Sequence, residues 1–241
     1  MKKVIVTGGS GFIGSNLVKY LLKKKYFVIN IDKLSYSANP YNLKELKGIK
    51  NYKFFKQDIN NRNEILKLLN RFKPVGIFNL AAETHVDRSI DNPKDFIKRN
   101  ILGVYNLLEE FKIFSKKNKK TKLIHVSTDE VYGDVLTGRS SENYPYKPSS
   151  PYAASKASSD HLVYSYAKTY NIPAIITNCS NNYGPYHFPE KLIPLMILNA
   201  LEGKPLPVYG QGHQIRDWLY VEDHARALVL VATQGSLNET Y

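Results

Sequence analysis

The 241-residue sequence predicts an α/β fold: a doubly wound parallel sheet with a smaller, truncated C-terminal lobe for a substrate. Three observations favour this class. Short β-branched runs alternate with amphipathic stretches, a glycine-rich turn joins the first such pair, and Pro and Gly become more frequent after Cys179. Repeated strand–helix units need right-handed crossovers, which place helices on both faces of a parallel sheet. Ligands of such sheets bind beyond the carboxyl ends of the strands.

The first strand–helix unit contains the glycine-rich turn. Residues 3–6 read as a buried strand and residues 12–25 as a helix, with glycines at positions 8, 11 and 14 between and at its start. Gly8 allows a tight turn, Gly11 lets backbone N–H groups approach a pyrophosphate, and Gly14 seats the helix closely on the strand. The free N–H groups of the helix N-terminus favour an anion. The spacing is G-x-x-G-x-x-G rather than G-x-G-x-x-G, so a glycine-rich turn without a ligand stays an alternative.

The second unit supplies an acidic residue at the end of its strand. Residues 27–31 form an apolar run that ends at Asp32, 18 positions after Gly14. A carboxylate at about this separation reaches the ribose hydroxyls of an adenosine. The same charge would repel a 2′-phosphate, so the sequence favours NAD over NADP.

The later elements follow the same alternation. We expect strands at 51–55, 75–80, 123–126 and 173–177, and helices at 62–72, 92–115 and 150–170. The last two helices each begin with a polar residue followed by Pro, the arrangement that suits a first helical turn. The inward face of the helix at 62–72 is apolar: Ile65, Leu66, Leu68 and Leu69. These elements predict a nucleotide-binding domain at 1–179 and a partial lobe at 180–241 with segments that return to the main domain.

Composition disfavours several classes of function. The formal net charge is +13, but the densest cluster, residues 116–122, follows a predicted helix and lacks the aromatics of a nucleic-acid platform. No apolar run approaches the ~20 residues of a membrane span. With Cys179 as its one cysteine and no paired histidine ligands, the chain predicts no disulfide and no metal site. We therefore expect a cytoplasmic protein that binds neither nucleic acid nor a membrane.

Two groups of residues suggest catalysis. Tyr152 and Lys156 lie four apart on the helix at 150–170, so they share a face, and a nearby cation lowers the phenol pKa from about 10. Such a pair is common in a chain with 18 tyrosines, so a structural role stays open. Thr128, Asp129 and Glu130 follow a strand, where two adjacent carboxyls would repel each other and keep one protonated, as a general acid requires. The alternative is a pair of surface loop charges.

Taken together, these motifs resemble the extended short-chain dehydrogenase/reductase family, in its nucleotide-sugar branch, and most closely the 4,6-dehydratases of that branch. The resemblance spans nearly the whole chain. It is carried by residues 7–15, 32–36, 80–89 (LAAETHVDRS), 127–133 (STDEVYG), 179–185 (CSNNYGP) and 214–224 (QIRDWLYVEDH), together with Asp58-Ile59 and the Tyr152/Lys156 pair. It implies a Rossmann-like fold and tightly bound NAD as cofactor.

The resemblance also assigns residues to roles. The implied catalytic residues are Thr128, Asp129, Glu130, Tyr152 and Lys156. The implied NAD-binding residues are Gly8, Gly11, Phe12, Ile13, Gly14, Asp32, Lys33, Leu34, Ser35, Asp58, Ile59, Leu80, Ala81, Ala82, Ser127, Tyr152, Lys156 and Asn182. The implied substrate-binding residues are Thr84, Thr128, Asn181, Lys191, Leu192, Pro207, Val208, Tyr209 and Arg216. Arg216 suits a diphosphate because its planar fork matches phosphate oxygens, although a pair with Asp217 or Glu222 is an alternative.

The implied reaction is dehydration of a nucleotide-diphosphate glucose, preferably dTDP-glucose, to the 4-keto-6-deoxy sugar, with NAD regenerated. Tyr152 takes the C4 hydroxyl proton, Glu130 the C5 proton, and Asp129 protonates the leaving C6 hydroxyl. UDP-glucose dehydration, a related epimerase or decarboxylase, and a non-catalytic NAD-binding protein remain alternatives; the adjacent carboxyls argue against epimerase and decarboxylase. By analogy the chain forms a homodimer. Family members continue past Tyr241, so we expect an incomplete substrate lobe.

Overall fold

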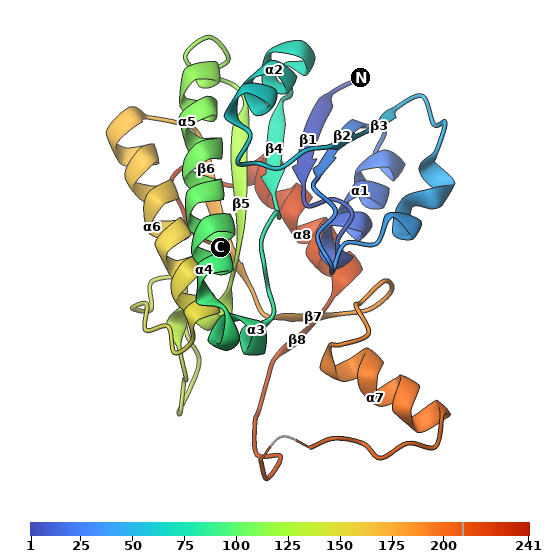
Figure 1. Cartoon of the computed structure of the whole chain (residues 1–241). Helices are drawn as coiled ribbons and strands as arrows, with labels where there is room; N and C mark the ends of the chain where they lie inside the picture. The colour runs from blue at the N-terminus through green and yellow to red at the C-terminus, as the bar shows by residue number, and fades with distance from the viewer. Residues whose placement is uncertain (209) are drawn as a thin grey trace.

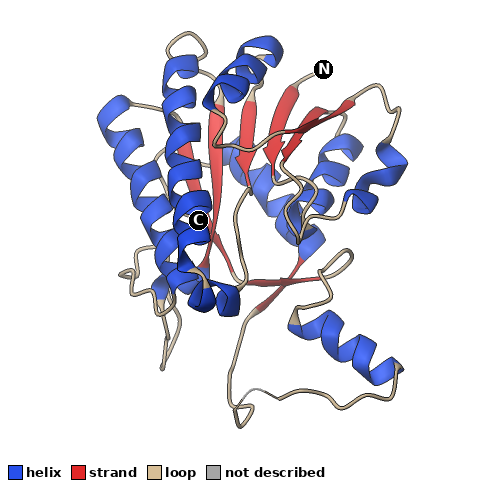
Figure 2. Ribbon diagram, viewed as in Figure 1, coloured by secondary structure: helices blue, strands red, loops and turns tan. Residues whose placement is uncertain are grey.

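The computed structural model, which describes residues 1–208 and 210–241, contains the predicted parallel sheet between two layers of helices (Figure 1, Figure 2). All neighbouring strands of this sheet are parallel, and the order β3-β2-β1-β4-β5-β6 reverses between β1 and β4. The strands are β1 (Lys3–Thr7), β2 (Phe27–Asp32), β3 (Tyr52–Lys56), β4 (Gly76–Asn79), β5 (Lys122–Thr128) and β6 (Ala174–Cys179). Such a reversal opens a crevice at the carboxyl ends, where ligands bind.

Two apolar cores separate the layers. Alternate residues of β1 point to opposite faces, so Ile5 joins the core under α2, α5 and α6, whereas Val4 and Val6 join the core under α1 and α8. The helices are α1 (Phe12–Lys23), α2 (Arg62–Phe72), α5 (Gly103–Ser115), α6 (Pro151–Tyr170) and α8 (Val221–Gln234). Both faces of the sheet are therefore buried, as its β-branched strands require.

Capping residues set the predicted helix starts. The Asn61 side chain accepts a hydrogen bond from the Glu64 N–H, and α2 covers residues 62–72 as predicted. The Ser150 hydroxyl accepts from the Ala153 N–H at the start of α6, with Pro151 as the first helical residue. Within α2, Ile65, Leu68 and Leu69 are buried and Leu66 packs partly buried against the same core.

The predicted helix at 92–115 has a more complex form. It consists of α4 (Pro93–Phe96), a π-helical segment η2 (Ile97–Leu102) and α5. Three short helical segments before β6 were not predicted: α3 (Val86–Asp91) and the 3₁₀ segments η1 (Pro40–Leu46) and η3 (Asp129–Tyr132). Each has seven residues or fewer, too short to show a helical period in the sequence.

The C-terminal residues form a small second layer that returns to the main sheet. Strands β7 (Asn181–Tyr183) and β8 (Trp218–Tyr220) pair in parallel as a separate two-stranded sheet. Helix α7 (Leu192–Leu201) projects away from the main body (Figure 1) and has no buried residue. In contrast, Ala225 and Leu228 of α8 pack with Leu17 and Leu21 of α1. Helix α8 therefore packs on the same core as α1; the division into two domains stays a prediction.

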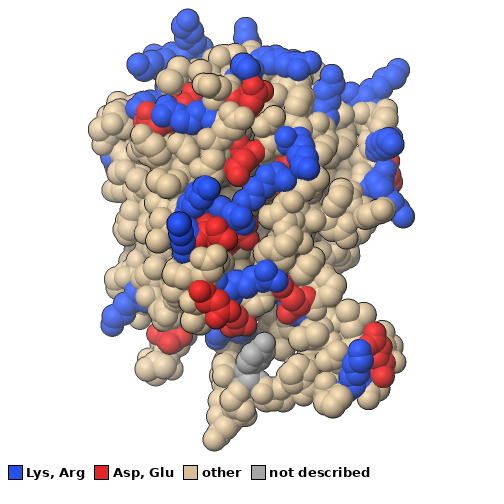
Figure 3. All heavy atoms as spheres, viewed as in Figure 1, with Lys and Arg blue, Asp and Glu red and all other residues tan. Residues whose placement is uncertain are grey.

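Surface charge is mixed on the face shown in Figure 3, where Lys and Arg side chains alternate with Asp and Glu. In the described residues, no helix is long and apolar enough to cross a bilayer. Within the same ranges, no group of His, Cys, Asp and Glu has the arrangement of a metal site.

Candidate active site

A cavity of about 920 Å³ lies at the carboxyl ends of the strands, between the main sheet and the C-terminal layer. It brings together nearly all residues that the sequence assigns to cofactor and substrate. Leu34 does not line it but lines a smaller neighbouring cavity, and Asp129 lines neither. The predicted substrate residue Tyr209 lies outside the described residues.

The glycine turn has the shape that a pyrophosphate needs. Gly8 has a φ of +71°, and a Cβ there would lie 2.8 Å from backbone atoms of Leu80 and Ala81. A Cβ on Gly14 would lie 2.1 Å from the Gly8 carbonyl oxygen. At Gly11, by contrast, a Cβ would meet only that oxygen, at 3.4 Å. Protein packing therefore explains Gly8 and Gly14, while the bare backbone at Gly11 faces the cavity, where a phosphate would bind.

Asp32 lies at the end of β2, where two backbone N–H groups fix its carboxylate. Its two carboxylate oxygens accept hydrogen bonds from the backbone N–H groups of Ser10 (2.9 Å) and Leu34 (2.8 Å). Burial raises the Asp32 pKa, although both N–H groups and the Lys33 ammonium oppose this rise. Asp32 lines the cavity, and its carboxylate has the acceptor oxygens that the hydroxyls of an adenosine ribose need. The turn and Asp32 together are consistent with NAD.

Sequence analysis did not predict an ion-pair cluster around Glu83. Glu83 is 4% exposed, pairs with the Arg99 guanidinium, and lies 3.7 Å from the Lys33 ammonium. Lys33 also lies 3.9 Å from Asp58. Glu83 follows Leu80-Ala81-Ala82 directly, so its place after a strand was the available signal. Its partner Arg99 lies on the η2 segment, which sequence periodicity does not reveal.

Tyr152 and Lys156 occupy one face of α6, as their spacing predicts. Both are buried, with 7% and 4% exposure, and both line the cavity. The Lys156 ammonium donates a hydrogen bond to the Val126 carbonyl at 2.8 Å. The expectation that Lys156 lowers the phenol pKa is wrong for the chain by itself. Burial and the nearby Glu130 carboxylate raise the Tyr152 pKa well above its ordinary value, and burial lowers that of Lys156.

Thr128, Asp129 and Glu130 form the turn from β5 into η3. The Thr128 hydroxyl accepts from the Glu130 N–H at 3.3 Å and donates to an Asp129 carboxylate oxygen at 3.2 Å. Burial raises the pKa of both carboxyls, and Asp129 raises that of Glu130 further. The two carboxyls are thus neither solvated loop charges nor fully independent groups. Their mutual repulsion favours the state in which one of them keeps its proton.

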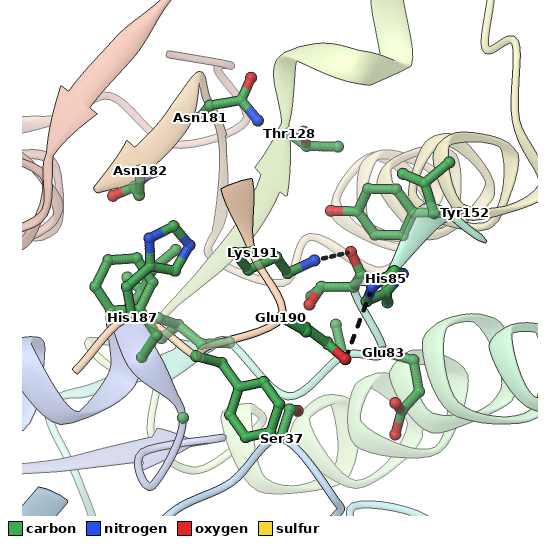
Figure 4. Close-up of a pocket in the computed structure, with 18 of the residues that line it drawn as sticks. Ser37, Glu83, His85, Thr128, Tyr152, Asn181, Asn182, His187, Glu190 and Lys191 are labelled. Atoms are coloured by element: carbon green, nitrogen blue, oxygen red, sulfur yellow. Dashed lines mark hydrogen bonds and ion pairs between the residues drawn. The ribbon is translucent and has the colours of Figure 1, made fainter. Parts of the chain in front are cut away.

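The opposite wall contains the predicted substrate residues. The Lys191 ammonium donates to the Thr84 carbonyl at 3.3 Å (Figure 4). The Asn182 side chain donates to the Ser180 carbonyl and lies 2.8 Å from the His224 imidazole. Arg216 donates to its neighbour's carbonyl, and no ion pair joins it to Asp217 or Glu222 in the described ranges. Its charge lowers the pKa of Asp129 and Glu130, so a cation lies near both carboxyls.

The segment 186–190, just before the predicted residue Lys191, adds cavity-lining side chains that the sequence did not reveal: His187, Phe188 and Glu190. His187 stacks on Phe12 with ring centroids 4.3 Å apart. Glu190 accepts a hydrogen bond from the Tyr36 hydroxyl at 3.0 Å and lies 3.7 Å from the His85 imidazole (Figure 4). Its partners lie 102 or more residues away in the sequence, so no local pattern could indicate them.

A doubly wound parallel sheet, a cofactor-shaped glycine turn and a Tyr-x-x-x-Lys pair in one cavity define a dinucleotide-dependent enzyme of the short-chain dehydrogenase/reductase type. The family model described as GDP-mannose 4,6 dehydratase matches residues 5–241. The chain belongs to this family.

Curated relatives make the resemblance more specific. The dTDP-glucose 4,6-dehydratase of Neisseria meningitidis serogroup B is 54% identical over 249 residues, covering 100% of this chain and 70% of that protein. The dTDP-glucose 4,6-dehydratase 1 of Escherichia coli K12 is 51% identical over 255 residues, covering 99% of this chain and 71% of that protein. The chain therefore spans about 70% of the length of these relatives.

Solved structures of related enzymes have the same fold as this chain. The dTDP-glucose 4,6-dehydratase of Bacillus anthracis, in complex with NAD, matches with a TM-score of 0.91 and 47% identity, covering 100% of this chain and 74% of that one. UDP-glucose 4-epimerase of Thermotoga maritima matches with a TM-score of 0.90 but only 31% identity, covering 99% and 75%. The fold is thus shared with epimerases, while sequence identity is higher to the dehydratase.

Proposed function

We propose that this chain is a hydro-lyase that converts dTDP-glucose to its 4-keto-6-deoxy derivative with bound NAD. The observation that carries the proposal is the convergence of Thr128, Glu130 and Tyr152 on the cavity that the glycine turn also lines. The identity of about half to dTDP-glucose 4,6-dehydratases supports the choice of reaction and of thymidine nucleotide. UDP-glucose is the alternative substrate.

The chemistry supplied by bound NAD is reversible acceptance of a hydride, from C4 of the hexose and back to C6. The chain's own residues handle the protons. Tyr152 would take the C4 hydroxyl proton as a phenolate, the form that the positive nicotinamide ring of bound NAD favours, and Thr128 holds O4. The resulting 4-ketone acidifies the C5–H bond, which Glu130 deprotonates, while Asp129 protonates the C6 hydroxyl so that it leaves as water. When the hydride returns to C6, a proton returns to C5. The pKa values of both carboxyls are raised by burial, which supports acid–base exchange near neutral pH.

Substrate placement follows from the charges on the opposite wall. Arg216 and Lys191 are cations that line the cavity, and Arg216 has the planar donor geometry that suits a diphosphate. With the hexose between Thr84 and Asn181, its C4–C6 edge would face Glu130. The adjacent carboxyls favour dehydration over epimerisation, because an epimerase needs the Tyr–Lys pair but no acid and base for loss of water.

The test is incubation of the purified chain with NAD and either dTDP-glucose or UDP-glucose, followed by alkali. A 4-keto-6-deoxy sugar absorbs strongly in base, so the expected result is a chromophore with dTDP-glucose and a weaker one with UDP-glucose. Absence of a chromophore with both donors, in a sample that binds NAD, would refute dehydration and favour a non-catalytic role.

Two variants separate the proton-transfer roles. Glu130→Gln should abolish exchange of the C5 proton with deuterated solvent while bound NAD is still reduced by substrate. Tyr152→Phe should lose that first reduction. Exchange at the wild-type rate in Glu130→Gln would assign the base to another residue, and normal NAD reduction in Tyr152→Phe would exclude the phenol.

We also infer a homodimer and a cytoplasmic location. Exposed apolar side chains lie along the outer helical layer: Ile97, Leu102, Tyr105, Ile113 and Tyr164, which are 38–52% exposed. A second copy of the same surface would cover them, as a two-fold interface requires. Ile113→Lys should shift the chain from dimer to monomer in analytical ultracentrifugation; a monomeric wild type would refute this interface.

A further inference from the structure

A buried histidine outside the cavity has no part in the proposed reaction. His224 lies in the first turn of α8 and is 3% exposed. Its Nδ1 atom lies 2.8 Å from the side-chain amide oxygen of Asn182, the middle residue of β7. Asn182 lines the cavity (Figure 4), whereas His224 does not. The imidazole therefore contacts a residue that the sequence assigns to NAD, without reaching the cavity itself.

The Ser180 carbonyl fixes which way the Asn182 amide is turned. The amide nitrogen of Asn182 donates a hydrogen bond to this carbonyl oxygen at 2.9 Å. A carbonyl oxygen can only accept, so the opposite rotation of the amide would bring two oxygens together with no proton between them. The amide oxygen of Asn182 therefore points to His224.

This orientation determines the tautomer of His224. An amide oxygen has no proton to give, so Nδ1 must be the donor. Burial lowers the His224 pKa to about 4, so the imidazole is neutral near neutral pH and carries its one proton on Nδ1. Nε2 is buried and has no hydrogen-bond partner among the described residues. A proton on Nε2 would be a buried N–H group without an acceptor, whereas the proton on Nδ1 has one.

The Asn182 amide nitrogen is the group that this arrangement leaves for a ligand. One of its two N–H groups is used by the Ser180 carbonyl. Burial raises the pKa of the Cys179 thiol, and a hydrogen bond from the Asn182 side chain opposes this rise. Cys179 also lines the cavity. Because sulfur is a weak acceptor, an oxygen of a bound ligand would take this second N–H group in its place.

We propose that His224 is a positioning residue for NAD, whose Nδ1–H group holds the Asn182 amide with its nitrogen available to an acceptor oxygen of the dinucleotide. The contact of Asn182 with NAD belongs to the proposed function, and this inference rests on it. Without the imidazole donor, the Asn182 amide oxygen would be buried and unpaired, which is costly. The side chain would then leave the orientation that the cofactor needs.

The test compares His224→Leu with His224→Asn by calorimetric titration with NAD, without sugar. Leucine removes the donor and keeps an apolar side chain, whereas the asparagine amide can place an N–H group near the position of Nδ1. We expect His224→Leu to weaken NAD binding about tenfold, the effect of one lost buried hydrogen bond. His224→Asn should bind NAD nearly as tightly as the wild type does.

Two controls separate positioning from a general loosening of α8. Leu228 lies one turn further along the same helix and packs with α1, so Leu228→Ala should lower the Tm but leave NAD affinity near that of the wild type. In the second control, His224→Leu is added to Asn182→Ala. Since the residue through which His224 acts is then absent, NAD binding should weaken no further.

Wild-type NAD affinity in His224→Leu would overturn the proposal, as would an equal loss of affinity whether or not Asn182 is present. These measurements need no sugar, so they remain decisive if dehydration itself is refuted. If His224→Leu does not fold, heteronuclear NMR of the imidazole nitrogens in the wild-type chain replaces it. His224 should be neutral at neutral pH with its proton on Nδ1, and a proton on Nε2 would refute the proposed hydrogen bond.

Discussion

Gly14 and Gly11 should respond to the same substitution in opposite ways. In Gly14→Ala the new Cβ would lie 2.1 Å from the Gly8 carbonyl oxygen and 2.7 Å from the Gly9 Cα, both backbone atoms. That carbonyl also accepts a hydrogen bond from the Gly11 N–H at 3.2 Å, so the turn cannot shift without losing it. Overpacking of this kind costs about 3 kcal/mol. In a chain of this size that corresponds to a fall in Tm of roughly 6–12 °C.

Gly11→Ala is the matched control. Its Cβ would meet only the Gly8 oxygen, at 3.4 Å, and Gly11 has an ordinary extended backbone with φ of −76°. As a helix N-cap without a side-chain hydrogen bond, it should lose at most about 1 kcal/mol on becoming Ala. The methyl group would instead occupy the approach to the pyrophosphate and weaken NAD binding at least about tenfold, or 1.4 kcal/mol.

Thermal denaturation without NAD and calorimetry with NAD measure the two effects separately. Gly14→Ala should have low stability, and Gly11→Ala should have low NAD affinity at nearly normal stability. Equal loss of Tm in both variants, or wild-type NAD affinity in Gly11→Ala, would show that the glycines serve packing alone.

Three further predictions test the charges of the cavity. Asp32→Asn should weaken NAD binding and reduce the preference for NAD over NADP, because the repulsion of a 2′-phosphate is lost. Calorimetry with both dinucleotides measures this preference, and an unchanged preference would show that Asp32 does not contact the ribose. Asp129→Asn should raise the Tm at pH 7 by a few degrees. The pKa values of Asp129 and Glu130 are raised in the folded chain, so ionisation of these carboxyls lowers the stability of the fold as pH rises above about 4. The gain in Tm from Asp129→Asn should therefore vanish below that pH. A lower Tm than that of the wild type at pH 7 would contradict this. Cys179, with a pKa raised by burial to about 12, should react with iodoacetamide at pH 8 at least about 100-fold more slowly than in urea, as followed by mass spectrometry.

Sequence patterns predicted those parts of the fold that repeat locally. Strands and helices with strong apolar periods, such as α2, appear within a residue or two of their expected bounds, because each period records which face is buried. The segment 92–115 has such a period at its end, in α5, but not through η2, where a π-helical turn changes the spacing. α7 was missed for the opposite reason: it is apolar all round and has no buried face from which a period could arise.

The site was predicted where motifs are contiguous and missed where contacts are distant. Thr7–Ser15, Thr128–Glu130 and Tyr152/Lys156 each bring their chemistry within five positions or along one short loop. The Glu83–Arg99 pair and the contacts of Glu190 depend on elements far apart in the chain. The pKa of Tyr152 was misjudged for a related reason: the spacing indicated a nearby cation, but burial and Glu130, which raise the pKa, depend on tertiary structure.

The buried face of helix α6 is partly polar, so sequence patterns do not reveal it, although it positions residues of the site. Its buried positions include Tyr152, Lys156, Ser159 and Asp160, so polar and apolar residues mix on the inward side and no apolar stripe marks it. The carboxyl end of strand β5, which packs against this face, is equally polar: His125, Ser127 and Thr128 are all buried there. The hydrogen bonds between these two elements replace the apolar contacts that other helices make with the sheet. Because directional bonds fix side-chain orientation more strictly than apolar packing does, the polar seam between α6 and β5 can hold a phenol and an ammonium at one place in the cavity.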